Sequence, residues 1–105
     1  MPVGISKAEL LIITDILKRY ANNYEFYFYG SRVHGNFEKA SDLDILVKGD
    51  KEMPYCELER LKEILDESLL PYVVNFADYH GMDGKFYNSI ESGLVKVEAS
   101  SFEDD

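Results

Sequence analysis

Residues 26–47 constrain the fold of this chain more than any other stretch. Residues 26–29 are four consecutive aromatic side chains, a run that favours a well-covered β-strand. Gly30 then permits backbone angles that are closed to other residues, and Ser31 is a good helix N-cap with a free hydroxyl. Residues 41–47 predict a second strand. We therefore expect a strand, a tight turn, a short helical start, a loop and a second strand.

Ten residues separate Ser31 from a pair of aspartates, Asp42 and Asp44. Side chains two apart on a strand point to the same face, so these carboxylates should project together while the alternate apolar residues take the other face. Adjacent carboxylates repel each other unless a cation lies between them, and their hard oxygen ligands suit Mg2+. The neighbouring Gly-Ser turn favours a phosphate. A phosphate cradle beside a two-carboxylate metal site indicates phosphoryl or nucleotidyl transfer.

The spacing Gly30-Ser31, ten residues, Asp42-X-Asp44 matches the signature of the nucleotidyltransferase superfamily, which includes polymerase β and kanamycin nucleotidyltransferase. The short length, the turn GSRVHG and the strand SDLDILV resemble the minimal nucleotidyltransferases, which are often antitoxins encoded beside a helical HEPN-domain partner. The resemblance covers residues 6–97. It implies an α/β (α+β) fold with a polymerase-β-like nucleotidyltransferase core, a mixed β-sheet with helices packed chiefly on one face.

The resemblance also implies a reaction. Asp42 and Asp44 would hold one or two Mg2+ ions on the triphosphate of ATP, and Gly30, Ser31 and Arg32 would contact the nucleotide. An acceptor hydroxyl would attack the α-phosphorus in line, and pyrophosphate would leave. By resemblance the acceptor would be a tyrosine of a HEPN toxin, so the reaction would be an AMPylation that silences the toxin. The small size of the chain supports an external acceptor, since no substrate domain is present.

The third strand, expected at residues 72–78, departs from the family pattern. In the family this strand supplies a third carboxylate, and the matching position here is Asn75. Asparagine keeps an oxygen ligand but loses the negative charge, which weakens a second metal site and any role as base. Asp78 is three residues further on, an offset that places it on the opposite face unless a bulge intervenes. We favour loss of the acid over its replacement by Asp78.

Two other functions compete with catalysis. Because of Asn75, the chain could be a weakened or inactive homologue that neutralises its partner by binding, with nucleotide retained as a structural ligand. Alternatively, Asp42 and Asp44 could form a solvated strand end and the Gly-Ser turn could be merely a turn. The combined spacing of the two halves disfavours this last interpretation.

Three charged residues near the turn have open roles. Arg32 either reaches phosphate oxygens or forms a solvated salt bridge. His34 is either a ligand or base, or a partly exposed structural histidine, and we favour the structural role because nothing in the motif requires imidazole there. Lys39, in a polar loop, either neutralises a triphosphate or is simply solvated, and we favour solvation.

Two further residue types carry weaker signals. Tyr27 and Tyr29 are either base-stacking residues or, as is more common in a central strand, core or interface residues, and we favour the core. Cys56 is an ordinary helix residue, because no nearby histidine or second cysteine offers a nucleophile or zinc arrangement.

The remaining elements follow from capping signals and periodicity. Ser6 and Glu9 have capping-box spacing at the start of a helix that runs to Tyr20 or Ala21. Pro54 suits the first turn of a second long helix. The other predictions are a helix over residues 55–69, a helical segment over residues 85–92, a short edge strand over residues 94–97, one domain over residues 1–98 and a frayed acidic tail over residues 99–105.

Composition excludes several function classes. With 20 acidic against 11 basic residues, the net charge of −9 disfavours general binding to nucleic acid or to anionic membranes. No stretch is long enough to span a membrane and no signal peptide is evident, so the expected location is the cytoplasm. A single cysteine, which cannot form an intrachain disulfide, fits that reducing compartment. The sequence leaves the oligomeric state open, a homo-oligomer included.

Overall fold

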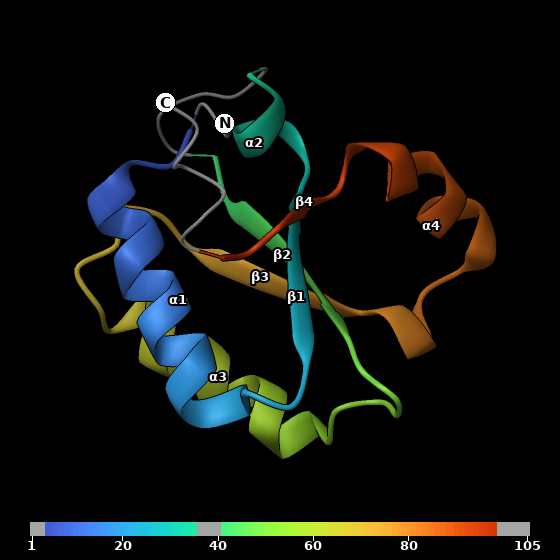
Figure 1. The fold of residues 1–105 in the computed structure, drawn as a ribbon, viewed down its shortest axis with the longest axis horizontal. Coiled ribbons are helices and arrows are strands. Elements are labelled where there is room, and N and C mark those ends of the chain that lie inside the picture. Colours follow the sequence, from blue (N-terminus) through green and yellow to red (C-terminus); the bar gives the residue numbers. More distant parts are fainter. Residues whose placement is uncertain (1–3, 36–40, 99–105) are drawn as a thin grey trace.

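A four-stranded mixed sheet organises the computed structural model, which describes residues 4–35 and 41–98 (Figure 1). The sheet order is β3-β2-β1-β4. β1 runs antiparallel to β2 and β4, whereas β2 and β3 are parallel. The strands are β1 (Glu25–Tyr29), β2 (Leu43–Lys48), β3 (Val74–Asp78) and β4 (Val95–Lys96).

The two long helices lie on one side of the sheet and a shorter helix lies on the other (Figure 1). The long pair packs together and supplies one wall of the hydrophobic core. This arrangement confirms the expected mixed sheet with helices chiefly on one face. The helices are α1 (Lys7–Ala21), α2 (Ser31–His34), α3 (Tyr55–Asp66) and α4 (Gly84–Ile90), with single 3-10 turns at Tyr79–Gly81 and Glu91–Gly93.

The start of α1 confirms the capping box. Ser6 Oγ accepts a hydrogen bond from the Glu9 amide at 3.1 Å, and Glu9 Oε1 accepts one from the Ser6 amide at 3.0 Å. This reciprocal pair satisfies two amides that the helix itself leaves without partners. Leu10, Ile13 and Leu17 then face the core at helical spacing.

α3 is shorter than the periodicity predicts, because it ends at Asp66 and not at Leu69. The Ser68 amide and hydroxyl both donate to the Leu65 carbonyl, so a tight final turn replaces another α-helical turn. Leu69 is 91% exposed and provides no packing that would hold a longer helix. Pro54 is the N-cap and not a residue of the first turn.

Alternation along the strands separates two faces. Phe26 and Phe28 of β1, with Ile45 of β2 and Val74 of β3, are buried against α1 and α3. Leu46 points to the opposite face and is also fully buried. The sheet is therefore covered on both sides over part of its length.

Strand ends differ from the predicted ones by one or two residues, and β1 begins one residue earlier and β2 ends one residue later than predicted. β3 begins at Val74 and not at Tyr72, since pairing starts where the Leu43 amide donates to the Val73 carbonyl at 2.8 Å. β4 confirms the predicted short edge strand. The predicted tail, residues 99–105, lies outside the described residues.

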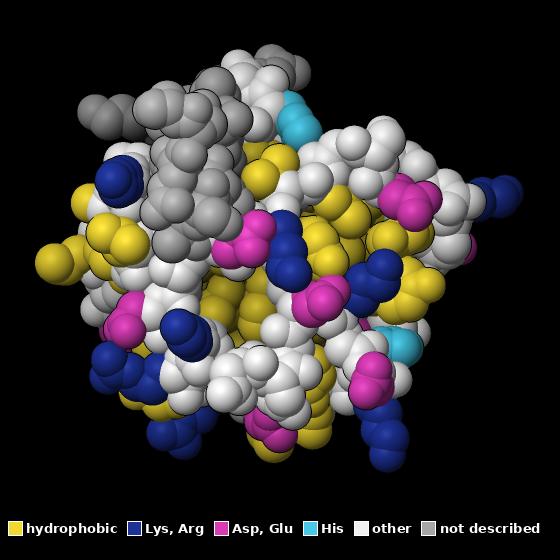
Figure 2. Space-filling view, viewed as in Figure 1, with side chains coloured by type: hydrophobic (Ala, Val, Ile, Leu, Met, Phe, Trp, Pro, Cys, Tyr) yellow, Lys and Arg dark blue, Asp and Glu magenta, His cyan; other side chains and the backbone are white. Residues whose placement is uncertain are grey.

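An open groove of about 820 Å3 lies between the C-terminal half of α1 and the β1–β4 edge. Figure 2 shows apolar side chains in this hollow, with charged side chains around it. None of the residues of the predicted nucleotide site lines it. Within residues 4–35 and 41–98, no helix combines the length and apolar character needed to cross a membrane.

Candidate active site

The sheet brings three of the predicted site residues, Asp42, Asp44 and Asn75, together on one face. Asp44 of β2 pairs with Tyr29 at the end of β1 on one side and with Asn75 of β3 on the other. Asp42 lies two residues before Asp44, just ahead of the first residue of β2. The parallel pairing of β2 with β3 therefore places Asn75, which we predicted to match the family's third carboxylate, beside both aspartates.

A direct hydrogen bond joins two of these side chains. Nδ2 of Asn75 donates to Oδ2 of Asp42 at 2.7 Å. Asp42 is exposed, whereas Asp44 is half-buried. Burial raises the pKa of the Asp44 carboxyl, the nearby Asp42 carboxylate raises it further, and a hydrogen bond from Asn75 acts in the opposite direction. The site thus holds negative charge that a cation would stabilise.

The glycine turn touches the carboxylate pair. Gly30 has φ 88° and ψ −174°, a conformation that is essentially restricted to glycine. A methyl group in place of its α-hydrogen would lie 2.5 Å from Oδ2 of Asp44. Gly30, and not Ser31 as predicted, is the N-cap of α2, so the exposed Ser31 hydroxyl is not used as a cap. The backbone of the turn and the Asp44 carboxylate form one continuous surface.

Arg32 lies below this surface. It is 5% exposed, so the solvated position that one of the two predictions gave it is wrong. Its Nε donates to the Ser41 carbonyl at 2.9 Å and its Nη1 donates to the Gly4 carbonyl at 2.8 Å. The guanidinium also lies over the Tyr72 ring, 4.2 Å from the centroid. These contacts direct Arg32 into the protein and not toward a phosphate at the turn.

Asp78, the alternative acid, lies away from the two aspartates. Asp78 Oδ2 accepts from the Met53 amide at 2.8 Å and its Oδ1 accepts from the His80 amide at 2.9 Å, so it fixes two loops. It pairs with Val47, three residues beyond Asp44 along β2. His34 and Cys56 are exposed. Lys39 lies outside the described residues.

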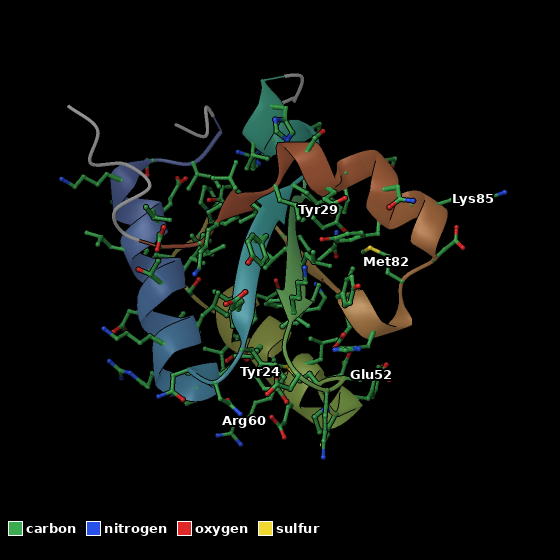
Figure 3. The ribbon with its side chains drawn as sticks, turned by 45° about the vertical axis from the view of Figure 1, so that its right-hand side comes forward. Tyr24, Tyr29, Glu52, Arg60, Met82 and Lys85 are labelled. Atoms are coloured by element: carbon green, nitrogen blue, oxygen red, sulfur yellow. The ribbon has the colours of Figure 1, made fainter. Side chains whose placement is uncertain are left out.

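The tyrosines of β1 correct the prediction of a core position. Tyr27 and Tyr29 are partly buried and lie on the sheet face opposite the main core. Figure 3 shows Tyr29 on the side of the sheet that α4 covers, where it meets Phe86 edge-on with centroids 6.1 Å apart. Burial, and next the Asp44 carboxylate, raise the pKa of the Tyr29 hydroxyl. Alternation within the aromatic run could have placed Tyr29 on the Asp44 face.

Sequence reasoning missed Lys48, which lies on the Asp44 face further along β2. Its Nζ donates to the Tyr87 hydroxyl at 3.1 Å and lies 4.8 Å from the centroid of the Tyr79 ring. Tyr79 and Tyr87 themselves pack edge-on with centroids 4.9 Å apart. This cluster fastens the segment that leads into α4 to the sheet. The strand alternation could have revealed this position, because Asp44, Leu46 and Lys48 are two residues apart and therefore lie on the same face of β2.

The donor set fits a divalent cation of the Mg2+ type. Asp42 and Asp44 offer carboxylate oxygens on one face, and the Asn75 amide could add a neutral oxygen after rotation of its side chain. Among the described residues, no group of three or more His, Cys, Asp or Glu side chains is placed to hold a metal, in line with asparagine at the third position.

Comparison with known proteins agrees with this geometry. The model of the polymerase β nucleotidyltransferase family matches residues 12–98. A protein described as probable protein adenylyltransferase MntA, from Haemophilus influenzae, is 32% identical over 96 residues, which cover 91% of this chain and 84% of that protein. A crystal structure from Shewanella oneidensis shares the fold, with a TM-score of 0.66 and 17% identity over 85% of this chain and 68% of its own. The chain therefore belongs to the polymerase β nucleotidyltransferase family and is a nucleotidyltransferase.

Proposed function

We propose that this nucleotidyltransferase transfers AMP from Mg-ATP to a tyrosine hydroxyl of a HEPN-type partner protein, and that it acts in the cytoplasm as an antitoxin. The observation that carries the proposal is the contact between the Gly30 turn and Asp44, beside Asp42. The name of the Haemophilus influenzae relative, a probable protein adenylyltransferase, supports a protein acceptor.

Each part of the site has a distinct task. Asp42 and Asp44 would hold the Mg2+, which would neutralise charge on the triphosphate. Gly30 has no side chain, so the β- and γ-phosphates can approach the backbone of the turn beside Asp44. Ser31 offers an exposed hydroxyl at the first position of α2. Arg32 is left out of the nucleotide contacts because its guanidinium points to backbone carbonyls.

The reaction is an in-line displacement. The acceptor oxygen forms a bond to the α-phosphorus while the bond from that phosphorus to the bridging oxygen breaks, and pyrophosphate leaves with the electron pair. The acceptor hydroxyl loses its proton to solvent, since the Asn75 amide cannot serve as the base that a carboxylate would provide. Asn75 therefore slows the step without removing the phosphate and metal contacts.

A second function is favoured by one observation, the hydrogen bond of Asn75 to Asp42. In that case the chain is a catalytically inactive transferase that neutralises its partner by binding, with nucleotide as a structural ligand. Both functions require the same surface and differ in whether the α-phosphate is transferred.

Label transfer separates the two. ATP labelled at the α-phosphate is incubated with Mg2+, the chain and its co-purifying HEPN-type protein. We expect label on the partner with the unmodified chain, more with Asn75→Asp, and none with Asp42→Ala/Asp44→Ala. Transfer only after Asn75→Asp would establish the binding function. Transfer that survives the double substitution would exclude this site.

A further inference from the structure

Arg32 connects the two halves of the site from inside the protein. Its guanidinium donates from Nε to the Ser41 carbonyl at 2.9 Å and from Nη1 to the Gly4 carbonyl at 2.8 Å. Arg32 immediately follows Ser31 of the turn, and Ser41 immediately precedes Asp42. One side chain therefore links the glycine turn to the segment that carries the first carboxylate.

The guanidinium is itself held in place. It lies over the ring of Tyr72, 4.2 Å from the centroid, and Tyr72 is 7% exposed. The Tyr72 hydroxyl donates to Oε1 of Glu9 at 3.0 Å, and the same oxygen accepts from the Ser6 amide in the capping box of α1. The start of α1 thus orients the ring on which Arg32 rests.

Gly4 packs so closely against Arg32 that there is no space for a side chain at position 4. A methyl group on Gly4 would collide with the carbonyl oxygen of Arg32 and would lie 2.5 Å from its Cγ. Arg32 is buried to 5% exposure, and a buried charge is tolerated only where hydrogen-bond acceptors and a ring face receive it. The planar guanidinium can reach two carbonyls in different directions, which a lysine ammonium on a flexible stem does less well.

We propose that Arg32 is a positioning residue for the divalent metal site, an inference that rests on the proposed function. It fixes the Ser41 carbonyl, and through it Asp42, at a set distance from the turn that carries Gly30. Residues that orient metal ligands from outside the coordination shell typically change metal affinity when they are replaced. Arg32 touches neither the metal nor the nucleotide in this role.

The test measures Mn2+ binding, since Mn2+ accepts the same hard oxygen ligands. The free-ion electron paramagnetic resonance signal is titrated with the full chain and with Arg32→Gln, Arg32→Lys and Tyr72→Leu. We expect Arg32→Gln to weaken Mn2+ affinity by roughly 10- to 100-fold, with a partial recovery in Arg32→Lys. Tyr72→Leu keeps the guanidinium and removes the ring beneath it, so it should weaken Mn2+ affinity less than Arg32→Gln does. It tests the same proposal if Arg32→Gln does not fold.

Two controls isolate the role of Arg32. Ile13→Ala shortens a fully buried side chain of α1 outside this network, so it should lower the melting temperature and leave Mn2+ affinity unchanged. Asp44→Asn should abolish specific binding. If the unmodified chain binds Mn2+ no better than Asp44→Asn, the proposed metal site itself fails. If Asp44→Asn loses binding while every folded Arg32 and Tyr72 variant keeps full affinity, the proposed function stands and the role of Arg32 is overturned.

Discussion

Nδ2 of Asn75 lies 2.7 Å from Oδ2 of Asp42 and donates a hydrogen bond to it. Because β2 and β3 are parallel and in register at Asp44 and Asn75, the amide stands beside both aspartates of the site. A carboxylate there would add a third negative charge, whereas the amide supplies hydrogen-bond donors. The Asn75 amide therefore stabilises the Asp42 carboxylate at a position where a third acid would repel it.

Replacing Asn75 with Asp should make stability depend on divalent cations. The substitution removes a donor from Asp42 and adds a like charge, so we expect a loss of roughly 1–3 kcal/mol in chelator. Mg2+ should restore much of that loss through binding to the folded state. Thermal unfolding with and without Mg2+ measures both effects. Asn88→Asp, on the exposed surface of α4, adds the same charge away from the site and should show no Mg2+ dependence.

Gly30→Ala should destabilise the fold and abolish nucleotide binding. The backbone at Gly30 lies in a region that costs other residues about 1–3 kcal/mol, and the new methyl group would lie 2.5 Å from Oδ2 of Asp44. Chemical denaturation and titration with ATP and Mg2+ report the two losses. Gly84→Ala is the matched control, because its methyl group would meet no atom within 4 Å. Equal effects of the two substitutions would contradict the assigned contact.

Asp44 should give the metal-free protein a specific dependence on pH. Its folded-state pKa is raised, chiefly by burial, so the folded state binds more protons than the unfolded state above the ordinary carboxyl pKa of about 3.9. This group's contribution to stability therefore decreases as the pH rises from about 3.9 through the raised folded pKa. Asp44→Asn should remove that decrease and stabilise the metal-free protein at neutral pH.

Melting temperature measured against pH in chelator tests this sign. Asp50→Asn, an exposed position in the turn after β2, controls for the loss of one negative charge. A pH profile of Asp44→Asn that coincides with that of the unmodified chain would show that Asp44 does not carry the effect. Metal affinity of the unmodified chain should also weaken as the pH falls toward the raised pKa, since the ligand must be deprotonated.

Lys48→Met should loosen the attachment of α4 to the sheet. The substitution removes the hydrogen bond to the Tyr87 hydroxyl and the ammonium over the Tyr79 ring, interactions worth roughly 0.5–2 kcal/mol together. Amide hydrogen exchange should quicken in residues 79–93 more than in β1 or β2. Lys85→Met provides the control, since Lys85 points away from the sheet at the outer end of α4 (Figure 3). If amide exchange in residues 79–93 is unchanged in Lys48→Met, Lys48 does not hold α4 to the sheet.

Local signals accounted for most of the secondary structure. The capping box of Ser6 and Glu9 predicted the start of α1 because it depends on four consecutive residues only. The end of α3 was predicted three residues too late, since apolar spacing alone does not reveal that Ser68 takes the Leu65 carbonyl. The aromatic run predicted β1 but not the different surroundings of its two faces.

The sequence by itself determined the family, the mixed sheet and the proximity of the Gly30 turn to the Asp42–Asp44 strand, because these follow from short-range spacing and strand periodicity. Only the tertiary structure decided where Arg32 points. Its partners, Gly4, Ser41 and Tyr72, come from three separate segments, and no local pattern shows that burial directs a guanidinium inward. The hydrogen bond of Asn75 to Asp42 likewise depends on the parallel register of β2 with β3, a contact between residues 33 positions apart in the sequence.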